Sequence, residues 1–140
     1  MTLVVGLGCQ RDCDVHALLA LFDGALADAG IERQRIVALA TIDRKQDEPG
    51  LRALAVLLNL PLECLSVAQL APYAEHLSHR SAVAFTHTGC YGVAESAALA
   101  LAEQLAGSPA RLLITRRKSA QATFALACAS DKPDNRPLRS

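Results

Sequence analysis

The chain has 140 residues, and its 14 Lys and Arg balance its 14 Asp and Glu, so the formal net charge is zero. This length is sufficient for one domain with a real core, and 51% of the residues are hydrophobic. The balanced charge argues against a nucleic-acid partner, because phosphate binding requires a basic face, but it leaves room for a small anion held by two or three placed cations.

The apolar segments are short. The start, MTLVVGLGC, lacks the basic leader of a signal peptide, and no apolar run approaches the roughly 20 residues of a membrane span. We therefore expect a cytoplasmic protein without a membrane partner. The five cysteines are odd in number and widely spread, which favours reduced thiols. Cys9 and Cys13 form a C-x3-C pair, but without a second pair this spacing predicts no metal site, and no cofactor is expected.

Strand-like and helix-like segments alternate along the first three quarters of the chain. The predicted strands are residues 2–8, 35–41, 62–67 and 81–86. The predicted helices are residues 14–29, 50–59 and 91–106, together with a helical stretch over 66–79 that Pro72 breaks. Asp12 or Asp14 can cap the first helix. Gly30 and Gly107 can end the first and the last helix.

Residues 111–129 differ from the alternating part, because they predict two strands around a polar turn at residues 119–121 and hence an antiparallel hairpin. Alternation of strand and helix predicts a parallel sheet covered on both faces, with right-handed crossovers. The predicted fold class is therefore α/β, a three-layer α/β/α domain over residues 1–130 with a mostly parallel, mixed sheet. The tail, residues 131–140, has little to bury and is expected to be disordered.

The turns that follow the predicted strands are the expected place for a ligand, because open α/β sheets bind ligands at the carboxyl ends of their strands. Three of the four turns are rich in glycine, hydroxyl and charged residues, and they are residues 6–12, 41–50 and 86–92. The fourth, residues 66–69, is plain. Function is therefore predicted on one rim of the sheet.

The first two turns allow both a binding role and a purely structural one. Gly6 and Gly8 let backbone N–H groups face an anion at a helix start, although glycine at a strand end is often only a turn device. The pattern lacks the third glycine of a dinucleotide fingerprint, and Asp43 falls too far along the chain for its acidic residue, so a nucleotide-binding domain is a weaker alternative. Glu48 can simply offset the dipole of the second helix, which does not explain Asp43 and Lys45.

The third turn, THTGCYG, is the richest. Thr88 and the N–H groups around Gly89 and Gly92 could cup a carboxylate or a phosphate. Cys90 is either a nucleophile, if a neighbouring histidine or helix start lowers its pKa, or a small apolar filler. Glu95 falls in the first turn of the next helix, where a capping role is a sufficient explanation.

The cations of the predicted hairpin also allow two interpretations. Arg116, Arg117 and Lys118 come directly before its polar turn. They could reach an acidic ligand, or they could protect an edge strand from pairing with another chain.

Four segments together resemble a known family. They are GLGC at 6–9 with Arg11, ALATIDRKQDEPGL at 38–51, TGCYGVAESAAL at 88–99 and KSAQATFALA at 118–127. In this order and at similar separations they resemble the cobalamin-biosynthesis proteins CobE and the C-terminal domain of CbiG, from Leu3 to about Ala129. A chain of this size is most similar to the stand-alone members of the CobE type, since CbiG carries a further N-terminal region.

The resemblance implies a role in the aerobic route to cobalamin (vitamin B12), with a precorrin or corrin tetrapyrrole as the bound intermediate and other enzymes of the pathway as candidate partners. Such rings are fringed with acetate and propionate groups, which a neutral protein can hold with glycine-rich turns and a few cations. We predict no catalytic residue. The predicted substrate-binding residues are Gly8, Cys9, Arg11, Asp43, Lys45, Glu48, Thr88, Gly89, Gly92 and Lys118.

Two functions of different classes follow, and the sequence leaves open whether the protein is an enzyme. The favoured one is an accessory protein that binds the intermediate and hands it on. The alternative is a hydrolase that opens the lactone of a precorrin-5 type intermediate and releases acetaldehyde, the activity with which CbiG is associated. The residues that could assist water in that reaction are Glu48, His87, Thr88 and Cys90.

Overall fold

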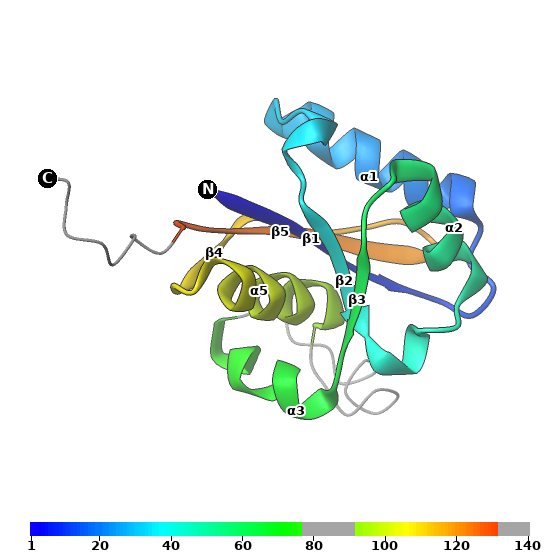
Figure 1. The fold of residues 1–140 in the computed structure, drawn as a ribbon. Helices are drawn as coiled ribbons and strands as arrows, with labels where there is room; N and C mark the ends of the chain where they lie inside the picture. Colours follow the sequence, from blue (N-terminus) through cyan, green and yellow to red (C-terminus); the bar gives the residue numbers. More distant parts are fainter. Residues whose placement is uncertain (77–91, 132–140) are drawn as a thin grey trace, which may run out of the picture.

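A computed structural model describes residues 1–76 and 92–131 (Figure 1). The strands of this part are β1 (Thr2–Cys9), β2 (Ala38–Ile42), β3 (Leu62–Leu65), β4 (Ala110–Lys118) and β5 (Ala122–Ala129). The α-helices are α1 (Val15–Ala29), α2 (Pro49–Leu58), α3 (Val67–Leu70) and α5 (Val93–Ala106). Short 3-10 helices cover Arg33–Arg35, Asp43–Lys45 and Ala71–His76. The predicted strand over 81–86 lies outside the described residues, and so does the tail over 131–140 that is predicted to be disordered, except for Asp131.

The strands form one mixed sheet in the order β3-β2-β1-β5-β4. β1, β2 and β3 are parallel, as their alternation with helices predicts. β5 pairs antiparallel with β1 along its whole length, from Thr2 opposite Ala129 to Cys9 opposite Ala122, and β4 pairs antiparallel with β5. The predicted C-terminal hairpin is therefore confirmed. Because β4 runs in the same direction as β1, the turn between β4 and β5 lies at the edge where β1 and β2 end.

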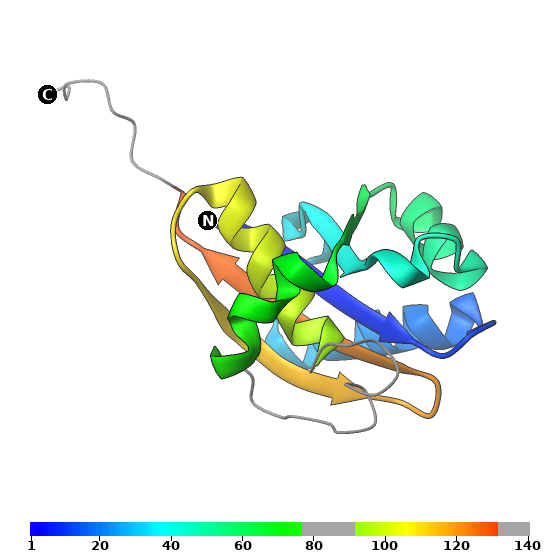
Figure 2. The same cartoon turned by 90° about the horizontal axis from the view of Figure 1, so that it is seen from below.

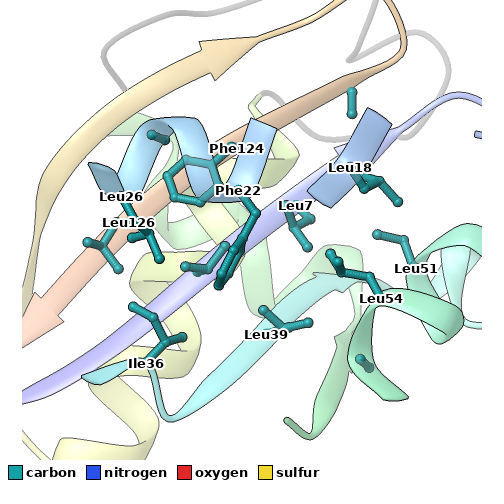
Figure 3. Packing of buried hydrophobic residues seen from close by; sticks show 14 of the residues in the cluster. Leu7, Leu18, Phe22, Leu26, Ile36, Leu39, Leu51, Leu54, Phe124 and Leu126 are labelled. Carbon is teal, nitrogen blue, oxygen red and sulfur yellow. The ribbon is translucent and has the colours of Figure 1, made fainter. Parts of the chain in front are cut away.

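Helices cover both faces of the sheet, which confirms the predicted three layers. α1 and α2 lie on one face, and α5 with the short α3 lies on the other (Figures 1 and 2). On the first face Phe22 and Phe124 meet edge to face, with ring centroids 6.0 Å apart, among leucines such as Leu7 and Leu54 (Figure 3). The other face is packed largely by the small side chains of α5. No helix among the described residues has both the length and the apolar character needed to cross a membrane.

The helix ends follow their capping residues. The Asp14 side chain accepts a hydrogen bond from the backbone N–H of His16, so Asp14 and not Asp12 caps α1. Gly30 and Gly107 adopt left-handed conformations and end α1 and α5, as predicted.

Two strand boundaries differ from the prediction by more than one residue. The second strand begins at Ala38 and not at residue 35, because Arg33–Arg35 form a 3-10 turn. The third strand ends at Leu65, because Ser66 and Gln69 form a capping box that starts α3.

The contact between β1 and α5 is a backbone contact. A Cβ atom on Gly6 would overlap the carbonyl oxygen of Ala94 and would lie 2.8 Å from the backbone nitrogen of Ala98. Only glycine allows the helix to approach the strand this closely. The contact fixes the first turn of α5 beside the carboxyl end of β1.

We expect Gly6→Ala to lower the free energy of unfolding by about 3 kcal/mol, because the added methyl group must push α5 away from the sheet. Gly24→Ala is the matched control. Gly24 lies inside α1 with nothing within 4 Å of its added Cβ, so this change should stabilise the protein by roughly 0.5–1 kcal/mol. Urea unfolding measures both changes, and an unchanged midpoint for Gly6→Ala would contradict the close contact.

Candidate functional site

A cavity of about 400 Å³ opens at the carboxyl edge of the sheet. Its described walls come from the end of β1, the turn after β2, the start of α5 and the β4–β5 hairpin. Figure 2 shows the end of β1 and the β4–β5 turn at the same end of the molecule. The lining residues are Gly8, Cys9, Gln10, Ile42, Lys45, Gly92, Val93, Ala94, Arg116, Lys118, Ser119, Ala120, Gln121, Ala122 and Thr123.

Three of the lining residues are cations, namely Lys45, Arg116 and Lys118. Within residues 1–76 and 92–131, no acidic side chain lines the cavity and no salt bridge involves these three cations. Arg117, between two of them in the sequence, points elsewhere and pairs with Asp28 of α1 at 2.8 Å. The residues that line the described walls of the cavity therefore carry positive charge and no negative charge.

The start of α5 adds to this positive character. Gly92, in a left-handed conformation, is the N-cap of the helix and supplies no side chain to bind the first N–H groups. Gly92, Val93 and Ala94 all line the cavity. Helix N-termini carry partial positive charge and favour anions, so the cations and the helix start act in the same direction.

The β4–β5 turn is fastened to the loop after β1. The backbone N–H of Gln10 donates to the carbonyl of Gln121 at 2.9 Å, and the Gln10 side chain donates to the carbonyl of Ala120 at 3.2 Å. The Gln121 side chain accepts from the N–H of Asp14 at 3.0 Å. Two loops far apart in the sequence thus form one continuous wall.

Two thiols and a buried carboxylate lie at the end of β1. The Cys9 and Cys13 thiols lie close enough to affect each other's pKa, and the Cys13 thiol donates to the carbonyl of Asp14 at 3.8 Å. Burial, reinforced by Cys13 and Glu48 and opposed by Lys45, raises the pKa of Cys9 to about 12. Burial is also the main cause that raises the pKa of Cys13. Glu48 is only 7% exposed, and its Oε2 has no hydrogen-bond partner in the described part of the chain.

The structure brings part of the predicted site together. Gly8, Cys9, Lys45, Gly92 and Lys118 line the cavity. Three other predicted residues are described but do not line the cavity: Arg11 and Asp43 are exposed, and Glu48 is buried. The remaining two predicted residues, Thr88 and Gly89, lie outside the described part of the chain. Among the described residues, no cluster of three or more His, Cys, Asp and Glu side chains could hold a metal ion.

The sequence did not predict that the hairpin turn supplies part of the cavity wall. It also allowed two roles for Arg116, which could bind an acidic ligand or protect an edge strand from pairing. The polar turn at residues 119–121 was a usable signal. What the sequence did not indicate is that β5 lies between β1 and β4, which carries the turn to the rim of the parallel strands.

Comparison with known proteins identifies the family. The family described as "Cobalamin synthesis G C-terminus" matches residues 3–127. "Protein CobE" of a Sinorhizobium species is 39% identical over 125 residues, which are 89% of this chain and 79% of that protein. The crystal structure of a CobE from the cobalamin (vitamin B12) biosynthetic pathway superposes with a TM-score of 0.89 at 45% identity and covers 94% of this chain and 93% of that one.

A longer relative matches over the same region. "Cobalt-precorrin-5A hydrolase" of Priestia megaterium is 28% identical over 125 residues, which are 89% of this chain but only 32% of that protein. The sheet, the family match and the CobE similarity agree over nearly the whole chain, and the chain belongs to the cobalamin-biosynthesis family of CobE and the CbiG C-terminal domain.

Proposed function

We propose that this protein binds a precorrin or corrin intermediate of cobalamin synthesis in the cavity at the carboxyl edge of the sheet, without covalent chemistry of its own. The observation that carries the proposal is the set of three cations, Lys45, Arg116 and Lys118, on a cavity whose described walls contain no acid. The acetate and propionate groups of a tetrapyrrole are the natural partners of such a set.

The size and the lining of the cavity support an edge-on mode of binding. Its volume of about 400 Å³ lies within the usual range for small-molecule sites. The carboxylates at one edge of the ring would enter it and form charge-assisted hydrogen bonds with the cations. The apolar face of the ring would then lie against apolar atoms of the rim, such as the half-buried side chain of Val93.

Three observations favour binding over lactone hydrolysis. The relative named as a hydrolase matches this chain over about a third of its own length. None of the described lining residues is a carboxylate or a histidine that could activate water. The Cys9 thiol, with its pKa near 12, remains protonated and is a poor nucleophile at neutral pH. His87, Thr88 and Cys90, which the sequence also suggests, lie outside the described residues.

We expect a coloured precorrin to change its absorption spectrum when it is titrated with the protein. The three single variants Lys45→Ala, Arg116→Ala and Lys118→Ala should each bind the precorrin about ten- to a hundredfold more weakly, because each change removes a charge-assisted hydrogen bond. Arg117→Ala is the matched control and should bind within about twofold of the wild type, because Arg117 is paired with Asp28. Equal losses in all four variants would indicate general charge attraction and contradict the site.

Asp43→Ala tests a residue that the sequence predicts but that does not line the cavity. Asp43 is exposed on the same 3-10 turn as Lys45. Unchanged affinity would confine the site to the cavity. A tenfold loss would extend the site along that turn.

The pigment recovered from the titration separates binding from catalysis. We expect its mass to be unchanged and no acetaldehyde to be released after prolonged incubation. A changed mass, or acetaldehyde in proportion to the pigment, would replace the binding proposal by the hydrolase alternative.

The Cys9 thiol should resist alkylation. At pH 8 a pKa near 12 lowers its thiolate fraction by more than about a thousandfold relative to an unfolded chain, so iodoacetamide should label Cys9 far more slowly in the folded protein than in urea. Peptide mass mapping distinguishes Cys9 from the other cysteines. Rapid labelling of folded Cys9 would contradict its raised pKa and would support a nucleophilic role.

A further inference from the structure

β4 carries two irregularities in its pairing with β5. From Leu112 to Ile114 the strand advances by two residues while its partner advances by one, from Ala127 to Leu126. From Ile114 to Arg117 it advances by three residues while its partner advances by two, from Leu126 to Phe124. Each shift places one extra residue in β4, as β-bulges do.

The second bulge decides where the hairpin cations point. In a regular strand, residues two apart share a face, so Arg116 and Lys118 would lie on the same face as Ile114. Ile114 packs against the core beside α1, and Arg117 reaches Asp28 on the same side. Arg116 and Lys118 instead line the cavity at the start of α5. The extra residue between Ile114 and Arg117 therefore turns both cations from the α1 face to the cavity face.

The second bulge has a specific partner in Glu95. Bulges interrupt the ladder and leave backbone groups to be satisfied elsewhere. The backbone N–H of Arg116 donates to Oε2 of Glu95 at 2.7 Å. Glu95 lies in the first turn of α5 and is fully buried. A buried carboxylate is costly unless it is well hydrogen-bonded, and the helix N-terminus also favours its charge.

This bond goes beyond the capping role that the sequence suggests for Glu95. A cap would satisfy N–H groups of its own helix, whereas this oxygen reaches a strand residue 21 positions later. The carboxylate therefore joins the start of α5 to the point of β4 at which the strand changes face.

We propose that Glu95 is a positioning residue of the anion site, because it holds the second bulge of β4 and so keeps Arg116 and Lys118 turned toward the cavity. The consequence for ligand affinity rests on the proposed function. The effect on the bulge does not depend on any ligand.

Two variants of nearly equal size separate hydrogen bonding from packing. Glu95→Gln keeps an oxygen that can accept the Arg116 N–H, and Glu95→Met fills a similar volume without such an oxygen. We expect hydrogen exchange of the Arg116 amide to be about ten- to a hundredfold faster in Glu95→Met than in the wild type, and little changed in Glu95→Gln. The amide of Leu126, which lies on the neighbouring strand, is the internal reference.

Precorrin affinity should follow the same pattern, with at least a tenfold loss in Glu95→Met and recovery to within about threefold of the wild type in Glu95→Gln. In a protein that already carries Arg116→Ala and Lys118→Ala, Glu95→Met should have almost no further effect, because Glu95 acts through these two cations. A merely structural role would reduce affinity equally in both backgrounds.

The outcomes distinguish this proposal from the proposed function. If the wild type binds no precorrin, the proposed function fails, and amide exchange together with nuclear Overhauser contacts between the Arg116 amide and the Glu95 side chain still tests the bulge. The positioning role is overturned if Glu95→Met keeps the Arg116 amide protected, if Glu95→Gln loses protection as Glu95→Met does, or if the affinity loss persists without the two cations.

Discussion

The arrangement of the candidate site depends on the backbone contact between Gly6 of β1 and Ala94 of α5. Because no side chain separates strand from helix there, the first turn of α5 lies directly beside the end of β1. Gly92 and Val93 are then at the cavity, and Glu95 is within reach of β4. A larger residue at position 6 would displace all three together. A packing constraint in the core thus fixes the geometry of a polar rim.

The direction of the hairpin is the second element of the arrangement. β5 runs antiparallel to β1 along its whole length, so its first residue, Ala122, is opposite Cys9 at the carboxyl edge. The β4–β5 turn therefore reaches the edge at which parallel sheets bind ligands. Hydrogen bonds from Gln10 to the turn hold it there. The antiparallel β4–β5 hairpin thus gives the cavity a wall that alternating strands and helices alone would not supply.

Local signals in the sequence were sufficient for most of the fold. The cap at Asp14, the glycines at 30 and 107 and the polar turn at 119–121 predict elements that the structure contains. The rule that ligands lie at the carboxyl edge pointed to Lys45, and the family resemblance pointed to Lys118, and both residues line the cavity. It could not separate Lys45 from Asp43, because their side-chain directions depend on a 3-10 turn that the sequence does not announce.

The sequence could not predict which side chains of β4 lie on which face of the sheet, for a different reason. RLLITRRK has no glycine or proline to mark a bulge, and regular alternation would group Leu112, Ile114 and Arg116 on one face. The two bulges are tertiary features, at least one of which is joined to a residue of α5 far away in the sequence. The sequence therefore predicted neither the place of the hairpin turn on the rim nor the orientation of Arg116 and Lys118 toward the cavity.

A protein without net charge can still present a positive site, because the positions of its charges matter and not only their sum. Arg33 pairs with Asp23 and Arg117 pairs with Asp28, both on the α1 side and both partly exposed to solvent. In the described part of the chain, the cations of the cavity have no such carboxylate. Walls of low polarity, such as Ile42 and Val93, also strengthen the field of neighbouring charges within a cleft. Under the proposed function, charge placement, and not the total charge of zero, determines which anion the edge of the sheet can hold.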